Sequence, residues 1–129
     1  MILAIDPGRD KCGIAQLTPD AHLLAKKVVP RQQLLQEISD LLALHDISLI
    51  VLGDSAHGRQ IEKELGKFNL KIEVALVPEK DSTLLARKRY WIDNPPRGLR
   101  KLLPLSLQLP PVPVDDYAAV ILGERYLRG

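Results

Sequence analysis

The spacing of apolar residues changes at Pro30, and this change restricts the chain to a small set of folds. Before Pro30, three short apolar runs (residues 1–6, 12–17 and 23–29) are separated only by Pro-Gly and Thr-Pro-Asp turn sequences. Runs so close together favour an antiparallel meander over β-α-β units. After Pro30, apolar residues recur every three to four positions, which is the period of a helix.

The rest of the chain alternates between helical and strand patterns. Helices are predicted over residues 34–44, 56–68, 82–91 and 115–127, and buried strands over residues 48–52 and 71–77. This order predicts an α/β fold, in which a mixed five-stranded sheet joins three antiparallel N-terminal strands to two parallel ones. Helices would cover both faces of the sheet. With 129 residues, we expect a single domain over 1–129.

Composition excludes several classes of protein. With 46% hydrophobic and 26% charged residues, the chain is not of the disordered type. No apolar run approaches the ~20 residues that cross a bilayer, and the first run stops at Asp6, too early for a signal peptide. Cys12 is the only cysteine, so no internal disulfide can form, and no Cys/His cluster has zinc-ligand spacing. We expect a soluble, cytoplasmic protein without a membrane partner.

Positive charge is concentrated in one segment, although the whole chain carries only +2. Residues 84–113 contain six bases and one acid, six of the ten prolines and the only tryptophan, Trp91. Because of the prolines, residues 93–113 are expected to be irregular. Aromatic residues among bases are typical of a surface that binds phosphates and stacks on bases. A solvated loop and a buried tryptophan explain the same pattern, and whether this loop binds substrate or a protein partner stays open.

Three acids stand at the ends of predicted elements. Asp6 ends the first strand, Glu79 follows the last strand by two residues, and Asp115 begins the last helix. Ligand sites in open α/β sheets form beyond the carboxyl ends of the strands, so these acids are expected to converge. Converging carboxylates raise one another's pKa unless a cation neutralises them, and oxygen ligands favour Mg²⁺ or Mn²⁺. Two such ions would activate a water and stabilise the leaving oxygen of a phosphodiester.

Each of these acids also has a purely structural explanation. Asp6 precedes a Pro-Gly turn, Glu79 stands among charged residues that water can solvate, and Asp115 suits the N-cap of a helix. Asp54 and Asp116 stand close to the same element ends, and whether either adds a metal ligand is left open.

Four segments resemble the RuvC/YqgF-type nucleases of the ribonuclease H-like superfamily. The opening hairpin of that family is similar to residues 5–15 (IDPGRDKCGIA), and its fourth strand to residues 51–58 (VLGDSAHG). The segment with a Glu after strand five is similar to residues 77–88 (VPEKDSTLLARK), and the closing Asp-x-x-Ala-Ala helix to residues 114–127 (VDDYAAVILGERYL). The similarity covers nearly the whole chain, and the YqgF branch is the nearest.

The resemblance implies a ribonuclease H-like fold and a metal-dependent nuclease. Asp6, Glu79 and Asp115 match the family's catalytic, metal-binding carboxylates. Small YqgF members are linked to maturation of the 5′ end of 16S ribosomal RNA and have been discussed as Holliday-junction resolvases. The implied partner is therefore precursor rRNA or branched DNA, bound by a monomer or a homodimer. The bases expected to position the nucleic acid are Arg9, Lys11, Arg87, Lys88, Arg89, Arg97, Arg100 and Lys101.

The chain departs from the family pattern at several positions. The family's Asp-Glu-Arg around strand five is Pro-Glu-Lys at residues 78–80, the usual Arg of the opening turn is Lys11, and a fourth acid of RuvC proper is Val112. Because of these differences, a second interpretation stays open, in which the protein binds nucleic acid but has lost catalytic activity. A sugar-kinase or actin-like ATPase half shares the sheet order, but it would need a second domain, for which we expect no room.

Overall fold

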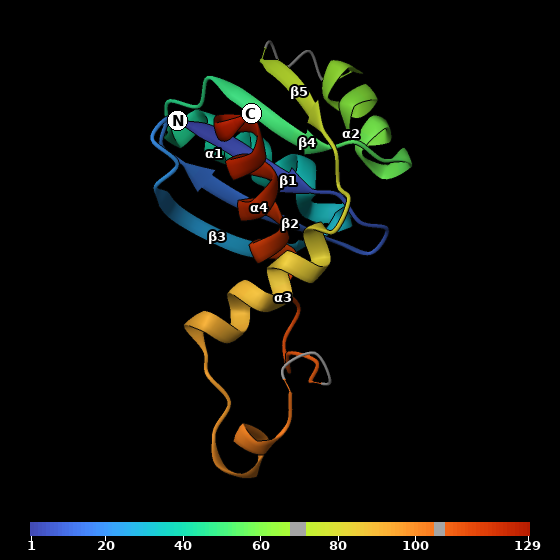
Figure 1. Ribbon diagram of the computed structural model, residues 1–129. Coiled ribbons are helices and arrows are strands. Elements are labelled where there is room, and N and C mark those ends of the chain that lie inside the picture. The colour runs from blue at the N-terminus through green and yellow to red at the C-terminus, as the bar shows by residue number, and fades with distance from the viewer. Residues whose placement is uncertain (68–71, 105–107) are drawn as a thin grey trace.

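The computed structural model of the protein describes residues 1–67, 72–104 and 108–129 (Figure 1). Five strands form one sheet in the order β3-β2-β1-β4-β5. The strands are β1 (Ile2–Asp6), β2 (Lys11–Leu17), β3 (Leu23–Pro30), β4 (Leu49–Gly53) and β5 (Glu73–Val77). The α-helices are α1 (Leu34–Leu44), α2 (Ala56–Lys67), α3 (Ser82–Asp93) and α4 (Asp115–Arg128), and two short 3-10 helices are η1 (Arg31–Gln33) and η2 (Gly98–Leu102).

The sheet is mixed, as the hydrophobic pattern predicts. β1 pairs antiparallel with β2, and β2 with β3, whereas β1–β4 and β4–β5 are parallel pairs. The first connections are too short for anything but hairpins, while α1 and α2 supply the crossovers that parallel pairing requires. The predicted fold class is therefore confirmed. Phe68 and Lys71, expected to end α2 and to begin β5, lie outside the described residues.

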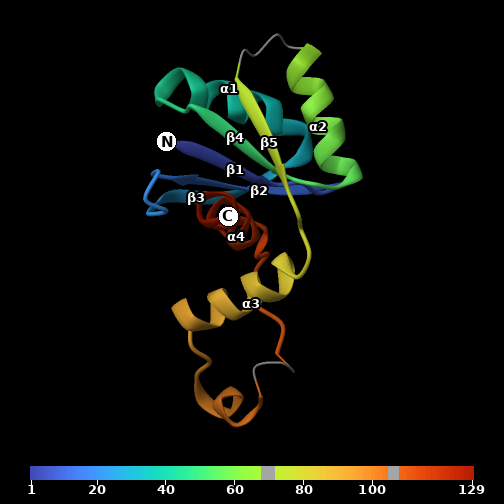
Figure 2. The ribbon, with the colours of Figure 1, turned by 45° about the horizontal axis from the view of Figure 1, so that its top comes forward.

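The two faces of the sheet are covered by different helices (Figure 2). Alternate residues of each strand point to opposite faces. Leu3 and Ile5 of β1 pack with α1 and α2, whereas Ile2 and Ala4 pack with α4. α3 lies on the outer side of α4, where Ala86 meets Tyr117 and Ala118. The layers are therefore α1 with α2, the sheet, α4, and α3.

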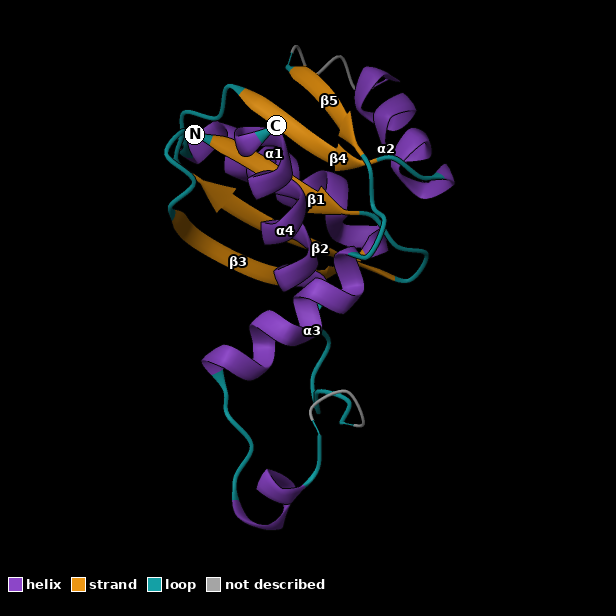
Figure 3. Ribbon diagram, in the orientation of Figure 1, coloured by secondary structure: helices purple, strands orange, loops and turns teal. Residues whose placement is uncertain are grey.

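A largely irregular segment, here called the proline-rich arm (residues 94–113), joins α3 to α4 and extends away from the sheet (Figures 1 and 3). The expectation that this segment is irregular throughout is wrong at η2, whose five residues form a 3-10 helix. Residues 97–103 contain no proline, so a helical turn can form there. None of the described helices is both long and apolar enough to cross a membrane.

Candidate metal site at the carboxyl edge of the sheet

The carboxyl ends of β1, β4 and β5 lie at one edge of the sheet because these strands are parallel. Ile5 pairs with Leu52, so extending the register by one residue places Asp6 beside Gly53. On the other side, Asp6 pairs directly with Gly13 of β2. Asp6 thus points to the α4 face between two glycines, one on each neighbouring strand.

Neither glycine has room for a side chain. A Cβ atom on Gly13 would lie 1.7 Å from the backbone oxygen of Asp115, and one on Gly53 would lie 2.1 Å from Oε1 of Glu79. The first residue of α4 therefore rests directly on β2, and the Glu79 carboxylate rests on the end of β4. Glycine inside a strand permits this close approach. The two glycines thus bring Asp115 and Glu79 to either side of Asp6.

Burial and mutual repulsion raise the pKa of the central acid. Burial, together with the smaller effects of the Glu79 and Asp115 charges, raises the pKa of Asp6 from its ordinary 3.8 to about 7. Asp6 therefore holds a proton over part of the neutral pH range unless positive charge is supplied. Both flanking acids therefore act electrostatically on Asp6.

The two flanking acids are also shifted upward. Burial raises the pKa of Glu79, a hydrogen bond from Ser55 opposes the shift, and the charge of Asp54 adds to it. Burial likewise raises the pKa of Asp115, with the Lys11 ammonium opposing. Each acid thus carries a desolvation cost that its neighbours do not remove.

Two carboxylate oxygens at this edge are buried without a hydrogen-bond donor. They are Oε1 of Glu79 and Oδ2 of Asp115, and neither has a hydrogen-bond partner within the described part of the chain. Lys11 Nζ lies 3.9 Å from Oδ2 of Asp115, which is too far for a hydrogen bond. Carboxylates only accept, so such oxygens are costly unless a donor or a cation reaches them. An oxygen-only set of this kind fits Mg²⁺ or Mn²⁺.

The spacing of the acids does not by itself define a metal centre. Over residues 1–67, 72–104 and 108–129, no group of three or more His, Cys, Asp or Glu side chains is arranged to hold a metal ion. Convergence of the three acids on a common cation therefore stays a prediction. Mg²⁺ commonly uses one or two carboxylates and completes its shell with waters and substrate phosphates, and such a shell does not require three converging side chains.

The contacts of Asp115 and Glu79 contradict the structural explanations for these two acids. The N-cap of α4 is Val114, and the helix has no side-chain cap hydrogen bond, so the N-cap explanation of Asp115 is wrong. Solvation does not explain Glu79 either, because its Oε1 is buried. Asp54 pairs with Arg59 at 3.1 Å, and Asp116 pairs with Lys26 at 2.8 Å. Both of these acids have their own counter-ions.

The predicted nucleic-acid-binding bases fall into two groups. Arg9 and Lys11 belong to the β1–β2 hairpin beside Asp6, where Arg9 pairs with Asp10 and both side chains are exposed. The others follow α3 and the arm, and η2 lies at the end of the arm furthest from the sheet (Figure 1). Of these bases, Lys11 lies 3.9 Å from the Asp115 carboxylate, and Arg9 belongs to the same hairpin.

Within the second group, each base has a different environment. Arg89 donates to Glu124 of α4 at 2.7 Å, so its charge is already neutralised. Arg87 and Lys88 line a mainly apolar hollow of about 360 Å³ beside α3, and Arg97 lines one of about 500 Å³. Lys101 is exposed on η2, and the side chain of Arg100 lies outside the described part of the chain.

The aromatic residues of α3 do not form an open stacking surface. Trp91 is buried, and its ring meets that of Tyr90 edge to face, with 5.1 Å between the ring centroids. Tyr90 in turn meets Tyr117 of α4 at 5.9 Å. Tyr90 and Tyr117 belong to the small core between α3 and α4. Trp91 is buried next to Tyr90, in agreement with the alternative that Trp91 is a core residue.

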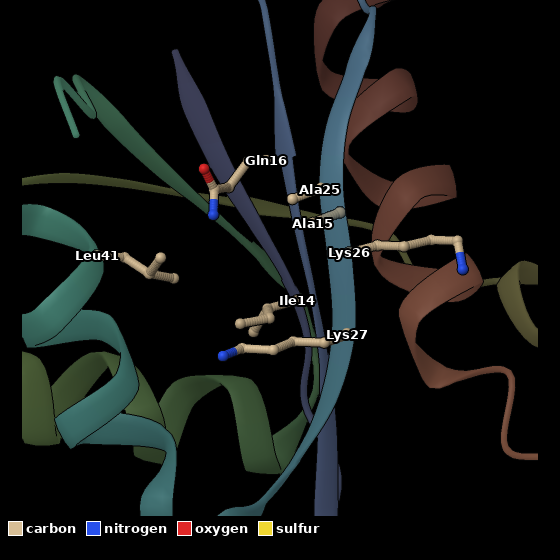
Figure 4. A pocket seen from close by; sticks show the side chains of 7 residues that line it. All are labelled: Ile14, Ala15, Gln16, Ala25, Lys26, Lys27 and Leu41. Atoms are coloured by element: carbon tan, nitrogen blue, oxygen red, sulfur yellow. The ribbon is translucent and has the colours of Figure 1, made fainter. Parts of the chain in front are cut away.

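A separate hollow of about 150 Å³ lies between β3 and α1 (Figure 4). Ile14, Leu41 and Lys27 face this hollow, while Lys26 points through to the α4 side. Ile14 and Leu41 belong to the core that α1 covers, so the hollow is on the face of the sheet opposite Asp6. It takes no part in the candidate site.

Sequence reasoning did not find three residues of the site. Ser55 and His57 act on the pKa of Glu79 from the start of α2, and Arg125 of α4 binds the backbone on either side of Glu79. The glycines at positions 13 and 53 were a usable signal, because glycine in a strand often marks a close approach. No local pattern announces Arg125, whose partners are more than 40 residues away.

Comparison with known proteins gives the fold. No family model matches the chain, and no curated protein matches it. The RuvC structure from Thermus thermophilus aligns with a TM-score of 0.55 and 12% identity, over 98% of this chain and 94% of that one. The protein therefore has a ribonuclease H-like fold, and its distant structural likeness to RuvC extends over the whole chain.

Two further solved structures align less well. The Lmo2764 protein from Listeria monocytogenes matches at 21% identity with a TM-score of 0.47, over 67% of this chain and 38% of its own. A ROK family glucokinase from Streptomyces griseus matches at 13% identity with a TM-score of 0.45, over 69% of this chain and 36% of its own. The chain thus spans less than two fifths of either protein.

Proposed function

We propose that this protein is a metal-dependent nuclease that hydrolyses phosphodiester bonds in nucleic acid. The observation that carries the proposal is the row of three acids, Asp6, Glu79 and Asp115, at the carboxyl edge of the sheet. There Asp6, with a pKa raised to about 7, lies between Glu79 and Asp115, each of which has a buried oxygen without a donor. A hard divalent cation is the chemical species that offsets all three costs at once.

Each residue of the row has a defined part in this proposal. Asp6, Glu79 and Asp115 would hold Mg²⁺ or Mn²⁺, which would supply an activated water and stabilisation of the leaving oxygen. Lys11 partly neutralises Asp115 and can offer a phosphate a single positive charge, and Arg9 stands exposed on the same hairpin. If O3′ leaves, the products carry a 5′-phosphate and a 3′-hydroxyl.

The proposed substrate is precursor ribosomal RNA, at the 5′ end of 16S rRNA. The support is the resemblance of residues 5–15, 51–58, 77–88 and 114–127 to the YqgF branch. The alternative is cleavage of branched DNA at a Holliday junction, and the likeness in fold to RuvC over 98% of the chain favours it. A resolvase cuts two symmetric strands, which requires two active sites and hence a dimer.

The test compares cleavage of precursor 16S RNA, single-stranded RNA and four-way-junction DNA, each with Mg²⁺ or with EDTA. Wild type is expected to cleave only with the metal, and Asp6→Asn to lose activity by several orders of magnitude. Asp20→Asn, in an exposed turn between β2 and β3, removes the same charge and is expected to cleave normally. Cleavage that persists in EDTA or in Asp6→Asn contradicts the metal–carboxylate mechanism.

The same assay separates the other readings. A monomer that cleaves RNA but not junction DNA supports the rRNA role, and a dimer that cleaves the junction symmetrically supports the resolvase. Salt-sensitive binding of RNA without turnover identifies a nucleic-acid-binding module that has lost chemistry, as Pro78 and Lys80 in the family's acid-and-arginine positions would suggest.

A further inference from the structure

The link that carries Glu79 is short and is fixed by its own backbone. Residues 78–81 connect β5 to α3, and the backbone nitrogen of Asp54 donates to the oxygen of Val77 at 2.7 Å where the link begins. The nitrogen of Ser82 donates to the oxygen of Glu79 at 2.9 Å, which closes a turn. Within that turn Asp81 has φ of +61°, a left-handed conformation uncommon for residues other than glycine.

Arg125 of α4 binds this link on both sides of Glu79. Its Nη1 donates to the backbone oxygen of Pro78 at 2.8 Å, and its Nη2 donates to that of Lys80 at 2.5 Å. A guanidinium is planar and holds its N–H groups in a fixed fork. The side chain therefore fixes the relative orientation of the two peptide groups that flank Glu79.

The contact is directed at the backbone and not at the Glu79 charge. The groups that shift the pKa of Glu79 are burial, Ser55, Asp54 and His57, and Arg125 is not among them. Nor does Arg125 form an ion pair with any acid in the described part of the chain. Its side-chain contacts with the link are thus the two hydrogen bonds to the backbone oxygens of Pro78 and Lys80.

We propose that Arg125 is a positioning residue, which holds the Glu79 carboxylate in its place on Gly53 beside Asp6. The inference rests on the proposed function, in which Glu79 is a metal ligand. α4 then serves two of the three acids, because it begins at Asp115 and holds Glu79 through Arg125. Groups that orient a metal ligand commonly change metal affinity 10- to 100-fold when removed.

The first experiment measures Mn²⁺ binding to the intact protein by calorimetry. Arg125→Ala is expected to weaken binding ~10-fold, and Arg125→Lys, which can reach one carbonyl but not both, to weaken it less. Arg128→Ala is the matched control, because Arg128 is exposed on the same helix and has no side-chain hydrogen bond or ion pair with any described residue. Equal affinity of Arg125→Ala and Arg128→Ala overturns the proposal.

The second experiment distinguishes positioning from general stabilisation. If Arg125 acts through Glu79, Arg125→Ala has no further effect on Mn²⁺ affinity in a Glu79→Gln background. A full ~10-fold loss in that background overturns the proposal. Should Arg125→Ala fold poorly, Arg125→Lys is measured in the same two backgrounds and must show the same pattern. Wild-type Mn²⁺ affinity in Glu79→Gln alone would instead remove Glu79 from the proposed metal site.

A third measurement tests how firmly the link is held, and it needs no metal. Amide hydrogen exchange of residues 79–82 is expected to accelerate in Arg125→Ala, while exchange in β1 and β4 stays as in wild type. Unchanged exchange in the link overturns the positioning role even if Glu79 is a metal ligand. The two proposals therefore fail by different results.

Discussion

The carboxyl edge of the sheet and the proline-rich arm are built in opposite ways. At the edge, residues far apart in sequence meet so closely that Gly13 and Gly53 have no room for a Cβ atom. The arm is one continuous segment, and apolar side chains such as Leu102 and Leu109 are exposed on it. Long-range backbone contact thus fixes the geometry of the acids, whereas apolar side chains of the described part of the arm face solvent.

A polar joint ties the end of α3 and the base of the arm to the body. The Tyr117 hydroxyl donates to Asp93 at 3.0 Å, and Lys26 of β3 lies 4.0 Å from the centroid of the Tyr117 ring. Lys26 also pairs with Asp116, so the end of α3, the start of α4 and the edge strand meet there. The joint orients the base of the arm, and further along the arm Leu109 lines the same hollow as Trp91 of α3.

The largest expected difference between the regions is in stability. Leu52 is fully buried at the centre of the sheet, whereas Leu102 on η2 is 80% exposed. Leu52→Ala is expected to lower the free energy of unfolding by about 2–5 kcal/mol, since it leaves a cavity. Leu102→Ala is expected to change it by less than about 0.5 kcal/mol. Urea denaturation of both variants checks this, and equal losses would mean that the arm is packed as tightly as the core.

A second comparison tests the close contact beneath α4. Gly13→Ala places a methyl group against the backbone of Asp115 and is expected to cost about 1–3 kcal/mol. Gly66 in α2 has nothing within 4 Å of a Cβ atom, so Gly66→Ala is expected to stabilise by about 0.5–1 kcal/mol. Thermal unfolding measures both. A loss of stability in Gly13→Ala together with a gain in Gly66→Ala supports the close contact of α4 with β2. A Gly13→Ala variant as stable as wild type would refute it.

The pH dependence of stability probes the buried acid. Because the pKa of Asp6 is near 3.8 unfolded and about 7 folded, the folded state binds the proton more tightly. Stability from this group is therefore full below pH 3.8 and is lost as pH rises towards 7. Without metal, Asp6→Asn is expected to be about 1–3 kcal/mol more stable than wild type at pH 8, with no difference near pH 4.

Denaturation at both pH values, with and without Mg²⁺, measures the effect. Added Mg²⁺ is expected to reduce the advantage of Asp6→Asn at pH 8, because a bound cation stabilises the ionised carboxylate of wild type. If the two proteins have the same stability at pH 8 in EDTA, Asp6 does not carry the raised pKa.

The smallest expected effect concerns the bases of the arm. If Arg97 and Lys101 contact phosphates, Arg97→Ala and Lys101→Ala each lower the slope of log affinity against log salt by about 1. Lys63→Ala is the control, because Lys63 is an exposed residue of α2, and this variant is expected to leave the slope unchanged. Filter binding to single-stranded RNA at several salt concentrations measures the slopes. Unchanged slopes in both arm variants would mean that these bases do not contact phosphates and that the arm binds a protein partner or is simply solvated.

Much of the body could be predicted from sequence because its signals are local. The short spacing between the first three apolar runs fixes hairpins, and the helical spacing of Leu34, Ile38 and Leu41 fixes α1. Asp6 and Glu79 could be placed at one edge because parallel strands end together. The α/β class and the mixed sheet follow from the same signals.

The remainder depends on contacts between distant residues. Asp115 fits the N-cap pattern, but Val114 takes that place, and the Asp115 backbone lies against Gly13 of β2. The αL conformation of Asp81, just before α3, belongs to the turn around Glu79. A short 3-10 helix such as η2 has no apolar period to reveal it.

α4 has a consequence for which sequence changes the fold can tolerate. Each residue of an α-helix moves the chain 1.5 Å along the helix axis and turns it by about 100° around that axis. A single residue inserted between Asp115 and Arg125 would therefore turn the guanidinium away from the β5–α3 connection, although every named side chain would still be present. The number of residues separating these two positions is thus under the same constraint as their chemical identity.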